Sequence, residues 1–362
     1  VVSLVEASRK LEEELQQQLK ETVVSTGSTT DSPVEKAEVR PFVHLHVRSQ
    51  FSVLQSTIDL GSLIKRAKEY NMPAVAVTDN QNMFGMFKFV RDCAAAGIKP
   101  IIGCELIVCG DLKDKTKKDN GFQQVFIAKN KAGYLNLSKL SSIGFTEGFY
   151  YVPRVDKNEI LRLKGDLIAT TGGIFGEIPY KILNEGEEAA EEAFVWWKEN
   201  FGDDFYVELN RHFVPEEKVV NDVLLRFAKK YNVKYFASNN CYYLDKKEAN
   251  AHDILMCVKD GELQAKPKVY TGKIDRGHRF GLPNDEFYFK SSEEMHELFE
   301  DLPEVFDTID EIVNKIEEIK LKQDILLPEF TVPEGFGSQD DYLRHLTYEG
   351  AARLYPEMTD EV

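Results

Sequence analysis

Residues 60–108 of the chain read LGSLIKRAKEYNMPAVAVTDNQNMFGMFKFVRDCAAAGIKPIIGCELIV, and this stretch decides the fold. It holds two short apolar segments, 74–78 and 99–108, and each follows a segment with helical spacing of apolar residues, 60–70 and 84–96. Apolar strands separated by helices of this length are typical of a parallel sheet that is covered on both faces. The stretch therefore predicts an α/β fold.

The same alternation continues on both sides of this stretch. Further strands are expected at 42–47, 125–128, 167–170, 205–209 and 235–238, and further helices at 132–142, 187–200 and 216–231. At least seven such strands favour a closed or nearly closed β/α barrel, in which chemistry takes place at the carboxyl ends of the strands.

Beyond residue 290 the alternation stops. Ser291 and Glu294 have the spacing of a capping box before a helix, and further helices are expected at 304–320 and 340–354. The chain is accordingly divided into an upstream helix and linker at 1–40, a barrel at 41–290, and a helical connection at 291–362.

The first 38 residues differ in composition from the barrel. Four leucines share one helical stripe, and residues 21–38 are rich in Ser, Thr, Gly, Pro and charged residues, as flexible linkers are. This pattern indicates the end of an upstream domain followed by a linker. A tag or a fraying terminus is the alternative.

Composition limits the function classes. The net charge of −16 argues against a surface that grips nucleic acid everywhere, because phosphate binding needs a cationic face. No apolar run of roughly 18 residues is present, so no membrane span is expected. The 5 cysteines have no CxxC spacing and are predicted to be reduced core thiols of a cytoplasmic protein.

Histidines and carboxylates stand where the predicted strands end. His46 ends the first strand within an HxH pattern, Asp79 ends the second, and Glu105 lies in the third. Such residues at barrel strand ends are the usual ligands of di- or trinuclear hydrolytic metal centres. Arg48, however, places a fixed cation on the same strand face, and a nearby amide, Asn80, is a poor metal ligand. The residues therefore suggest an incomplete metal site.

Six motifs resemble one family. They are FVHLHVRSQFSVLQS (42–56), MPAVAVTDNQNMFG (72–85), GIKPIIGCEL (97–106), EGFYYVPRVD (147–156), ASNNCYYLDKKEANAHDILMCV (237–258) and PEFTVPEGFGSQDDYLRHLTYEG (328–350). In this order they are similar to the amino-terminal PHP domain of the bacterial DNA polymerase III α subunit. The resemblance covers about Pro41 to the carboxyl end. It implies a distorted seven-stranded β/α barrel, with the last motif belonging to the start of the polymerase palm.

The resemblance also implies eight metal-ligand positions, most of which have changed. His46 and Glu105 keep a plausible ligand, whereas the others carry Arg48, Gln55, Asn80, Gly173, Asn240 and Tyr242. Asp79 and His212 are possible neighbours of the same pocket. Two scattered ligands cannot hold a multinuclear centre, so the site is predicted to be vestigial, with no cofactor in this fragment.

The substitutions suggest how the pocket is filled. Arg48 is expected to supply the positive charge that metal ions would give to Glu105 and Asp79, pairing with Glu105. Asp79 could instead cap the following turn. We expect His46 to be hydrogen-bonded, His44 to pack or to bond to the backbone, and His252 to be structural. The role of His212 is left undecided, although solvated loop histidines are commoner than metal ligands.

The function implied by the resemblance is architectural. The fragment is expected to be non-catalytic, to brace the palm and the remainder of the same chain, and to dock or tether a proofreading exonuclease in cis or in trans. Nucleotidyl transfer, as a DNA-directed DNA polymerase, and contact with DNA would belong to the parent chain. Residues 1–38 could be the tether from a fused exonuclease. The alternatives are an active phosphoesterase with Zn²⁺ or Mn²⁺, acting as a pyrophosphatase or 3′-5′ exonuclease, and a stand-alone PHP phosphatase.

Overall fold

Parallel and antiparallel strands are mixed in one seven-stranded sheet of the computed structural model, which describes residues 39–361. The hydrogen-bonded order is β1-β2-β3-β5-β6-β7, and β4 pairs with β2. The strands are β1 (Ala74–Asn80), β2 (Lys99–Cys109), β3 (Phe122–Ala128), β4 (Val155–Asp156), β5 (Leu167–Thr170), β6 (Phe205–Asn210) and β7 (Tyr235–Ser238).

The prediction of a parallel sheet is wrong at β3, which runs antiparallel to both β2 and β5. A parallel neighbour requires a crossover, usually through a helix. Residues 110–121 contain no helix, so the chain turns back directly from β2 into β3. The other predicted neighbours, β1–β2, β5–β6 and β6–β7, are parallel.

The segment around His46 closes the sheet, although it is too irregular to be the strand predicted at 42–47. On one side the amide of Thr78 in β1 donates to the carbonyl of Val47 at 2.8 Å. On the other side the amide of Cys241 donates to the carbonyl of His46, and Val47 forms a parallel bridge with Cys241. The expected distorted β/α barrel is therefore confirmed.

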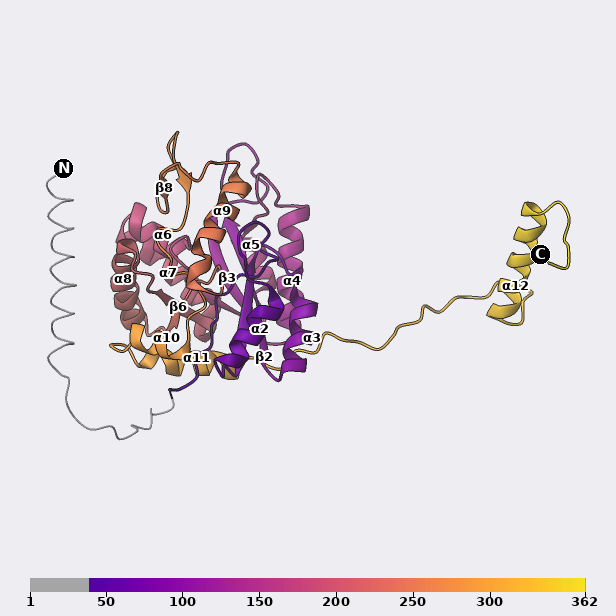
Figure 1. The fold of residues 1–362 in the computed structure, drawn as a ribbon, viewed down its shortest axis with the longest axis horizontal. Helices are drawn as coiled ribbons and strands as arrows, with labels where there is room; N and C mark the ends of the chain where they lie inside the picture. The colour runs from indigo at the N-terminus through magenta and orange to yellow at the C-terminus, as the bar shows by residue number, and fades with distance from the viewer. Residues whose placement is uncertain (1–38, 362) are drawn as a thin grey trace. The chain divides into compact units, whose positions relative to one another are not determined.

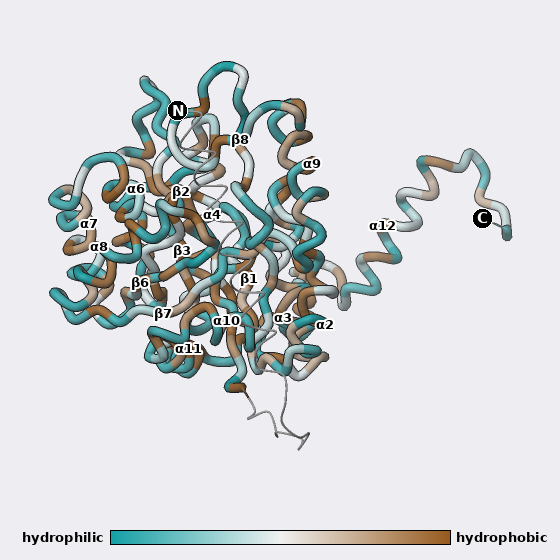
Figure 2. The backbone as a smooth tube through the Cα atoms, turned by 60° about the vertical axis from the view of Figure 1, so that its left-hand side comes forward, coloured by the Kyte–Doolittle hydropathy of each residue, from teal (hydrophilic) through white to brown (hydrophobic). Residues whose placement is uncertain are grey.

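Amphipathic helices surround the sheet (Figure 1). Helix α2, for example, buries Leu60, Leu63, Ile64 and Ala67 at helical spacing, and the Asp59 side chain caps its first turn. The helices are α2 (Leu60–Glu69), α3 (Met86–Ala96), α4 (Lys131–Thr146), α5 (Lys157–Leu163), α6 (Glu177–Asn184), α7 (Glu187–Phe201), α8 (Pro215–Tyr231), α9 (Ala249–Asp260), α10 (Ser292–Leu298), α11 (Glu304–Lys315) and α12 (Gln339–Leu354). Figure 2 colours the chain by the hydropathy of each residue and shows apolar residues in the strands and in the helices around them.

Two helices beyond residue 290 share the core of the barrel. The capping box at the start of α10 is confirmed, since the Ser291 hydroxyl accepts from the Glu294 amide and the Glu294 carboxylate accepts from the Ser291 amide. Ile309 and Ile312 of α11 are buried in the same apolar cluster as the strands. The boundary proposed at 290/291 stays a prediction. None of the residues of α12 is buried.

The cysteines, the absence of a membrane span and the small second sheet complete the description of residues 39–361. All 5 cysteines are buried and free, as expected for reduced core thiols. Between residues 39 and 361 no helix is long and apolar enough to cross a membrane. A small two-stranded sheet of β8 (Lys268–Val269) and β9 (Arg279–Phe280) was not predicted. The leucine stripe and the linker at 1–38 lie outside the described residues.

Candidate functional site

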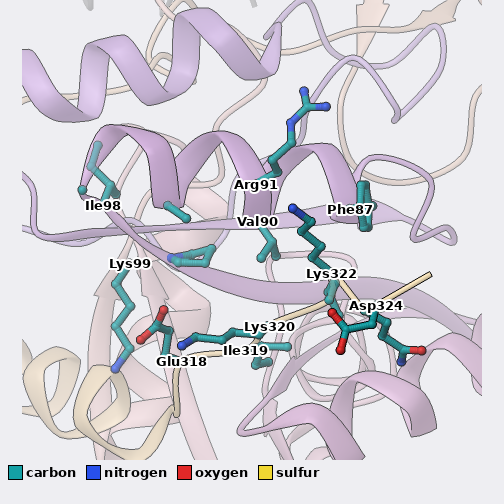
Figure 3. A pocket seen from close by; sticks show the side chains of 15 residues that line it. Phe87, Val90, Arg91, Ile98, Lys99, Glu318, Ile319, Lys320, Lys322 and Asp324 are labelled. Carbon is teal, nitrogen blue, oxygen red and sulfur yellow. The ribbon is translucent and has the colours of Figure 1, made fainter. Parts of the chain in front are cut away.

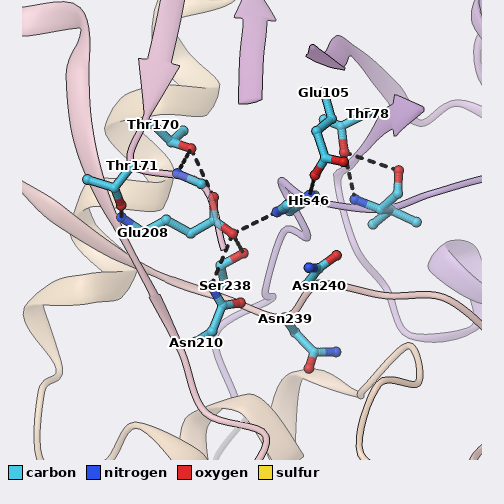
Figure 4. Close-up of polar contacts among 12 residues, drawn as sticks. His46, Thr78, Glu105, Thr170, Thr171, Glu208, Asn210, Ser238, Asn239 and Asn240 are labelled. Carbon is cyan, nitrogen blue, oxygen red and sulfur yellow. Dashed lines mark hydrogen bonds and ion pairs between the residues drawn. The ribbon is translucent and has the colours of Figure 1, made fainter. Parts of the chain in front are cut away.

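The candidate site is a buried polar cluster at the strand ends (Figure 4). His46 and Arg48 come from the segment that closes the barrel, Glu105 from β2, and Asn240 from the residues after β7. Each of these four side chains is buried. The structure therefore brings together residues that are 192 positions apart in sequence, such as Arg48 and Asn240.

His46 lies between two carboxylates. Its Nδ1 is 2.7 Å from Oε1 of Glu208, and its Nε2 is 3.1 Å from Oε2 of Glu105. Burial opposes the charged imidazole, but the negative charge of Glu208 and the hydrogen bonds to both carboxylates outweigh it and raise the pKa of His46. The predicted hydrogen-bonded histidine is confirmed. Both ring nitrogens already have a partner, so neither is free to ligate a metal ion.

Glu208 is a central residue that sequence reasoning missed. Besides His46, its carboxylate accepts hydrogen bonds from Thr170 at 2.9 Å, Ser238 at 2.9 Å and Asn210 at 3.2 Å. Burial works against the carboxylate, but His46 and these donors lower the pKa of Glu208 to about 2. The signal was present in the sequence FYVELN, where a single charged residue stands inside an otherwise apolar strand. No motif of the family resemblance contained it.

Arg48 completes the charge balance of the cluster. Its Nη2 lies 2.5 Å from Oε2 of Glu105, and its Nη1 donates to the side-chain oxygen of Asn240. The guanidinium carbon lies 4.4 Å from the centroid of the Tyr242 ring. Burial disfavours the charged guanidinium, yet Glu105 raises the pKa of Arg48, and Arg48 and His46 together lower the pKa of Glu105 against its own burial. The predicted pairing of Arg48 with Glu105 is confirmed.

Asp79 does not cap the turn after β1 and makes no hydrogen bond to Arg48 in the described part of the chain, although the positive charge of Arg48 acts on its carboxylate as expected. Its carboxylate accepts from the Ser49 amide and hydroxyl and from the Ser52 hydroxyl, each at 2.7 Å. It therefore holds the loop that follows Arg48 instead of capping the turn after β1 or contacting the guanidinium. Burial raises the pKa of Asp79 in spite of these hydrogen bonds.

The remaining predicted positions surround the same cluster. The Asn80 amide donates to the Gln55 side-chain oxygen at 2.7 Å, so two amides pair where the resemblance implies two ligands. A Cβ atom added at Gly173 would lie 3.3 Å from Nδ2 of Asn240, which places this position beside the cluster. Tyr242 is buried against Arg48. Five of the six changed positions thus contact one another, Asn80 with Gln55 and Arg48 with both Asn240 and Tyr242.

His212 is buried, so the expectation of a solvated loop histidine is wrong. Its Nδ1 lies 2.7 Å from Oε1 of Glu217, and its ring stacks on Phe287 with centroids 4.1 Å apart. His44 and His252 behave as expected, since each contacts a backbone carbonyl, that of Lys290 at 2.8 Å and that of Gln55 at 3.0 Å. Burial lowers the pKa of His44 to about 3 and that of His252 to about 4, which keeps both neutral.

Aromatic side chains cover this cluster. Tyr270, from the segment between β8 and β9, packs with its ring centroid 5.4 Å from that of Phe175 and 5.7 Å from that of Phe287. Phe287 in turn lies 6.0 Å from Tyr242, which contacts Arg48. This layer reduces the exposed fraction of Arg48 and Glu105 to 1% each. Both side chains are therefore shielded from solvent.

The donor set does not fit a catalytic metal centre. Between residues 39 and 361, no group of three or more His, Cys, Asp or Glu side chains is arranged to hold a metal ion. Both nitrogens of His46 are engaged by carboxylates, and the guanidinium of Arg48 lies within the cluster. Oε1 of Glu105 has no hydrogen-bond partner in the described part of the chain, but one oxygen beside a guanidinium is a poor site for a divalent cation.

A groove lies away from this cluster. It has a volume of about 970 Å³ and runs between α3, the start of β2 and residues 318–324 (Figure 3). Val90 and Ile98 form part of its apolar floor, and Lys99 and Lys320 lie at its edge. None of the predicted site residues lines this groove.

Comparison with known proteins identifies the family. Residues 44–212 match the family model of the PHP domain, so the chain contains a PHP domain. The chain is homologous to the PHP region of DNA polymerase III subunit alpha. It is 37% identical over 326 residues to that protein from Borreliella burgdorferi, covering 89% of this chain and 28% of the relative. The corresponding protein of Thermus aquaticus is 37% identical over 334 residues, covering 88% and 26%.

The chain spans about a quarter of the length of these curated relatives. A solved structure, titled as a putative metal-dependent phosphoesterase from Bifidobacterium adolescentis, is 13% identical with a TM-score of 0.37, covering 56% of this chain and 88% of that chain. That likeness is too distant to bear on function. The recognition made from the six motifs is confirmed by the family match and the polymerase relatives.

Proposed function

We propose that this chain is a non-catalytic, structural PHP domain of a replicative DNA polymerase. Its homology to DNA polymerase III subunit alpha supports a place in a polymerase chain. In this proposal the barrel braces the palm and the remainder of the same chain, and it docks or tethers a proofreading exonuclease in cis or in trans. DNA is bound through the parent polymerase, and the protein acts in the cytoplasm.

One observation carries the non-catalytic part of the proposal, namely the buried guanidinium of Arg48 bonded to Glu105 and Asn240. A hydrolytic metal centre works by placing divalent cations where they activate water and bind phosphate oxygens. Here a fixed monovalent cation stands between the carboxylate and the amide. It can neutralise Glu105, but it cannot activate water as a Lewis acid.

The balance of charges supports the same conclusion. Arg48 contacts Glu105, and His46 contacts both Glu105 and Glu208; the pKa values of Arg48 and His46 are raised, and those of the two carboxylates are lowered. Both carboxylates therefore already have a cationic or hydrogen-bonding partner within the chain. A further divalent cation would have to displace Arg48 or His46 from carboxylates that they already neutralise.

Exposed apolar residues support a partner beyond the barrel. Ile325, Leu326 and Leu327 are more than 80% exposed, in the stretch before the palm-like motif. Three consecutive exposed aliphatic side chains are unfavourable in water and are typical of a surface that is covered by another part of an assembly. The remainder of the polymerase is the occupant that the proposal assigns to them.

Elemental analysis of the purified chain, combined with a phosphoesterase assay, tests the proposal. We expect less than one equivalent of zinc or manganese per chain and no hydrolysis of pyrophosphate or of a DNA 3′ end, with or without added metal. The alternative, an active metal-dependent phosphoesterase, requires two or more equivalents and a hydrolytic activity that chelation abolishes. That result would refute the non-catalytic assignment.

A second experiment tests the bracing role in the full-length polymerase. Arg48→Met is compared with Arg162→Met, a surface arginine that pairs with Glu159 on α5. If the barrel is a brace, Arg48→Met lowers the temperature at which primer extension is lost, whereas the rate of extension well below that temperature stays near that of the parent. An equal effect of both variants would contradict the role.

A further inference from the structure

Four lysines form an exposed group on the loop between β2 and β3, which consists of residues 110–121. They are Lys113, Lys115, Lys117 and Lys118. The three aspartates of the loop are turned toward its backbone: Asp111 accepts from the Lys113 amide at 2.8 Å, Asp114 from the Thr116 amide at 2.9 Å, and Asp119 from the Gly110 amide at 2.9 Å. The lysine side chains therefore present their charge outward.

Two exposed aromatic side chains lie beside this loop. Tyr151 is 63% exposed and Phe149 is 51% exposed. Tyr151 has φ of +64°, which is unfavourable for a non-glycine residue. The ammonium of Lys118 lies 5.1 Å from the centroid of the Tyr151 ring. A strained backbone thus holds an aromatic ring in solvent next to a cation, and strain of this kind often marks a functional position.

A buried arginine joins the loop to the aromatic turn. Arg154 is 1% exposed, and its guanidinium donates to three backbone carbonyls: Gly148 at 3.2 Å, Asp119 at 3.1 Å and Asp114 at 3.4 Å. Two of these carbonyls belong to the lysine loop and one to the turn that carries Phe149. The lysines and the aromatic rings are therefore held in a fixed relation before any ligand arrives.

Two further cations lie at the same end of the barrel. Lys273 and Arg276 are exposed in the turn between β8 and β9. Figure 1 shows β8 and the loop after β2 at one end of the barrel, the upper end in that view. The two segments are linked through Phe175, whose carbonyl accepts from the Gln123 amide at 2.9 Å and whose ring packs 5.4 Å from that of Tyr270.

We propose that this surface, made of the 110–121 loop, the 149–151 turn and the β8–β9 turn, binds a single strand of nucleic acid. Lysines and an arginine that face outward attract phosphates, and aromatic rings give the unpaired bases a surface to stack on. Both features coincide here, in a chain whose net charge is −16. A duplex offers phosphates but no free base faces, so the aromatic turn favours a single strand. The inference does not depend on the structural role proposed above.

Fluorescence anisotropy with a labelled 15-residue oligothymidylate measures the proposed binding. The wild-type chain is expected to bind with a Kd on the order of 10 µM at low salt and to weaken several-fold when salt is raised from 50 to 200 mM. A duplex of the same length is expected to bind more weakly. Replacing the four loop lysines with Gln should weaken binding to the single strand at least tenfold.

A second quadruple variant serves as the matched control, because it loses the same number of positive charges at positions outside the proposed surface. Lys68, Lys131, Lys139 and Lys229 are exposed lysines on α2, α4 and α8, and their replacement with Gln should leave binding within twofold of wild type. Equal losses in the two quadruple variants would show that only the overall charge matters and would overturn the proposal. Absence of any single-strand binding by the wild type at low salt would overturn it as well, even if a protein were found to dock on the same surface.

Tyr151→Gly separates stacking from folding. Glycine adopts positive φ without strain, so this variant should melt at or above the temperature of the wild type. Loss of the ring should weaken single-strand binding about threefold or more and leave duplex binding unchanged. Unchanged single-strand affinity in a folded Tyr151→Gly variant would refute the stacking role.

Discussion

Arg48 and Glu105 form a buried ion pair, with 2.5 Å between Nη2 and Oε2 and 1% of each side chain exposed. Both residues occupy positions where the family resemblance implies metal ligands. The pair connects two parts of the sheet, because Glu105 lies in β2 and Arg48 lies in the segment that closes the barrel. A change at either residue therefore acts on barrel closure as well as on the charge of the pocket.

Removing the cation of Arg48 should destabilise the fold severely. Arg48→Met keeps most of the side-chain volume but leaves the buried carboxylate of Glu105 without its strongest partner. Loss of one member of a buried ion pair costs about 3–5 kcal/mol, because the other charge stays buried and uncompensated. Urea unfolding of the chain measures the loss.

The double variant Arg48→Met/Glu105→Gln serves as its control. Neutralising both partners removes the uncompensated charge, so the double variant should be more stable than Arg48→Met alone. A loss below about 1 kcal/mol in the single variant would mean that water or a bound cation already satisfies Glu105.

Arg48→His should not recreate a metal site. The change gives the pocket an HxH pair at His46 and position 48, but both nitrogens of His46 still contact carboxylates, and Asn240 and Tyr242 remain. Titration calorimetry with Zn²⁺ and Mn²⁺ should therefore detect no tight binding to this variant. Tight binding of one equivalent of Zn²⁺ or Mn²⁺ would show that a single substitution is enough to restore metal binding to this pocket.

The sequence predicted the Arg48–Glu105 pair but not the polar network behind it. The pair was predictable because an arginine stands at one of the implied ligand positions and a carboxylate stands at another. Glu208 was not predictable, because a lone carboxylate in a strand gives no spacing pattern. The serines that bond to Asp79 were not predictable either, because serines occur in loops of every kind. Strand positions followed from apolar runs, whereas the direction of β3 depended on the missing crossover helix at 110–121.

The serines that hold Asp79 should contribute measurably to stability. Ser49→Ala removes one hydroxyl donor to the buried carboxylate but leaves the backbone amide, and Ser52→Ala removes another. Each deletion should lower the free energy of unfolding by about 1–3 kcal/mol, since a buried charged acceptor loses a partner. Ser142→Ala on α4, where the exposed hydroxyl donates to the backbone carbonyl of Ser138, is the control and should change stability by less than about 0.5 kcal/mol. Wild-type stability in Ser49→Ala/Ser52→Ala would show that Asp79 is held by other groups.

Acid should unfold the chain in part through Glu208. The pKa of Glu208 is lowered to about 2 in the folded chain from an ordinary value of 4.5, so the folded state binds its proton less readily than the unfolded state. Its contribution is fully present above pH 4.5 and is lost as the pH falls toward 2. The raised pKa of His46 acts in the opposite sense, with a contribution that is present below 6.5 and lost as the pH rises through its folded value. The two residues together should therefore favour a stability maximum between about pH 4.5 and 6.5.

Glu208→Gln tests this pH dependence. The amide keeps the shape of the side chain but cannot ionise. Between pH 4.5 and pH 3 the slope of the free energy of unfolding against pH should therefore be smaller than in the wild type, by up to the equivalent of one bound proton. At pH 7 the variant should be less stable by about 3 kcal/mol, because burial of His46 then lacks its main counter-charge. Urea unfolding at several pH values measures both effects, with Glu188→Gln at an exposed position of α7 as the control that should leave the acid limb unchanged. If Glu208→Gln and the wild type lost stability with the same slope below pH 4.5, the acid sensitivity would belong to other carboxylates, and His46 would not depend on Glu208 for its charge.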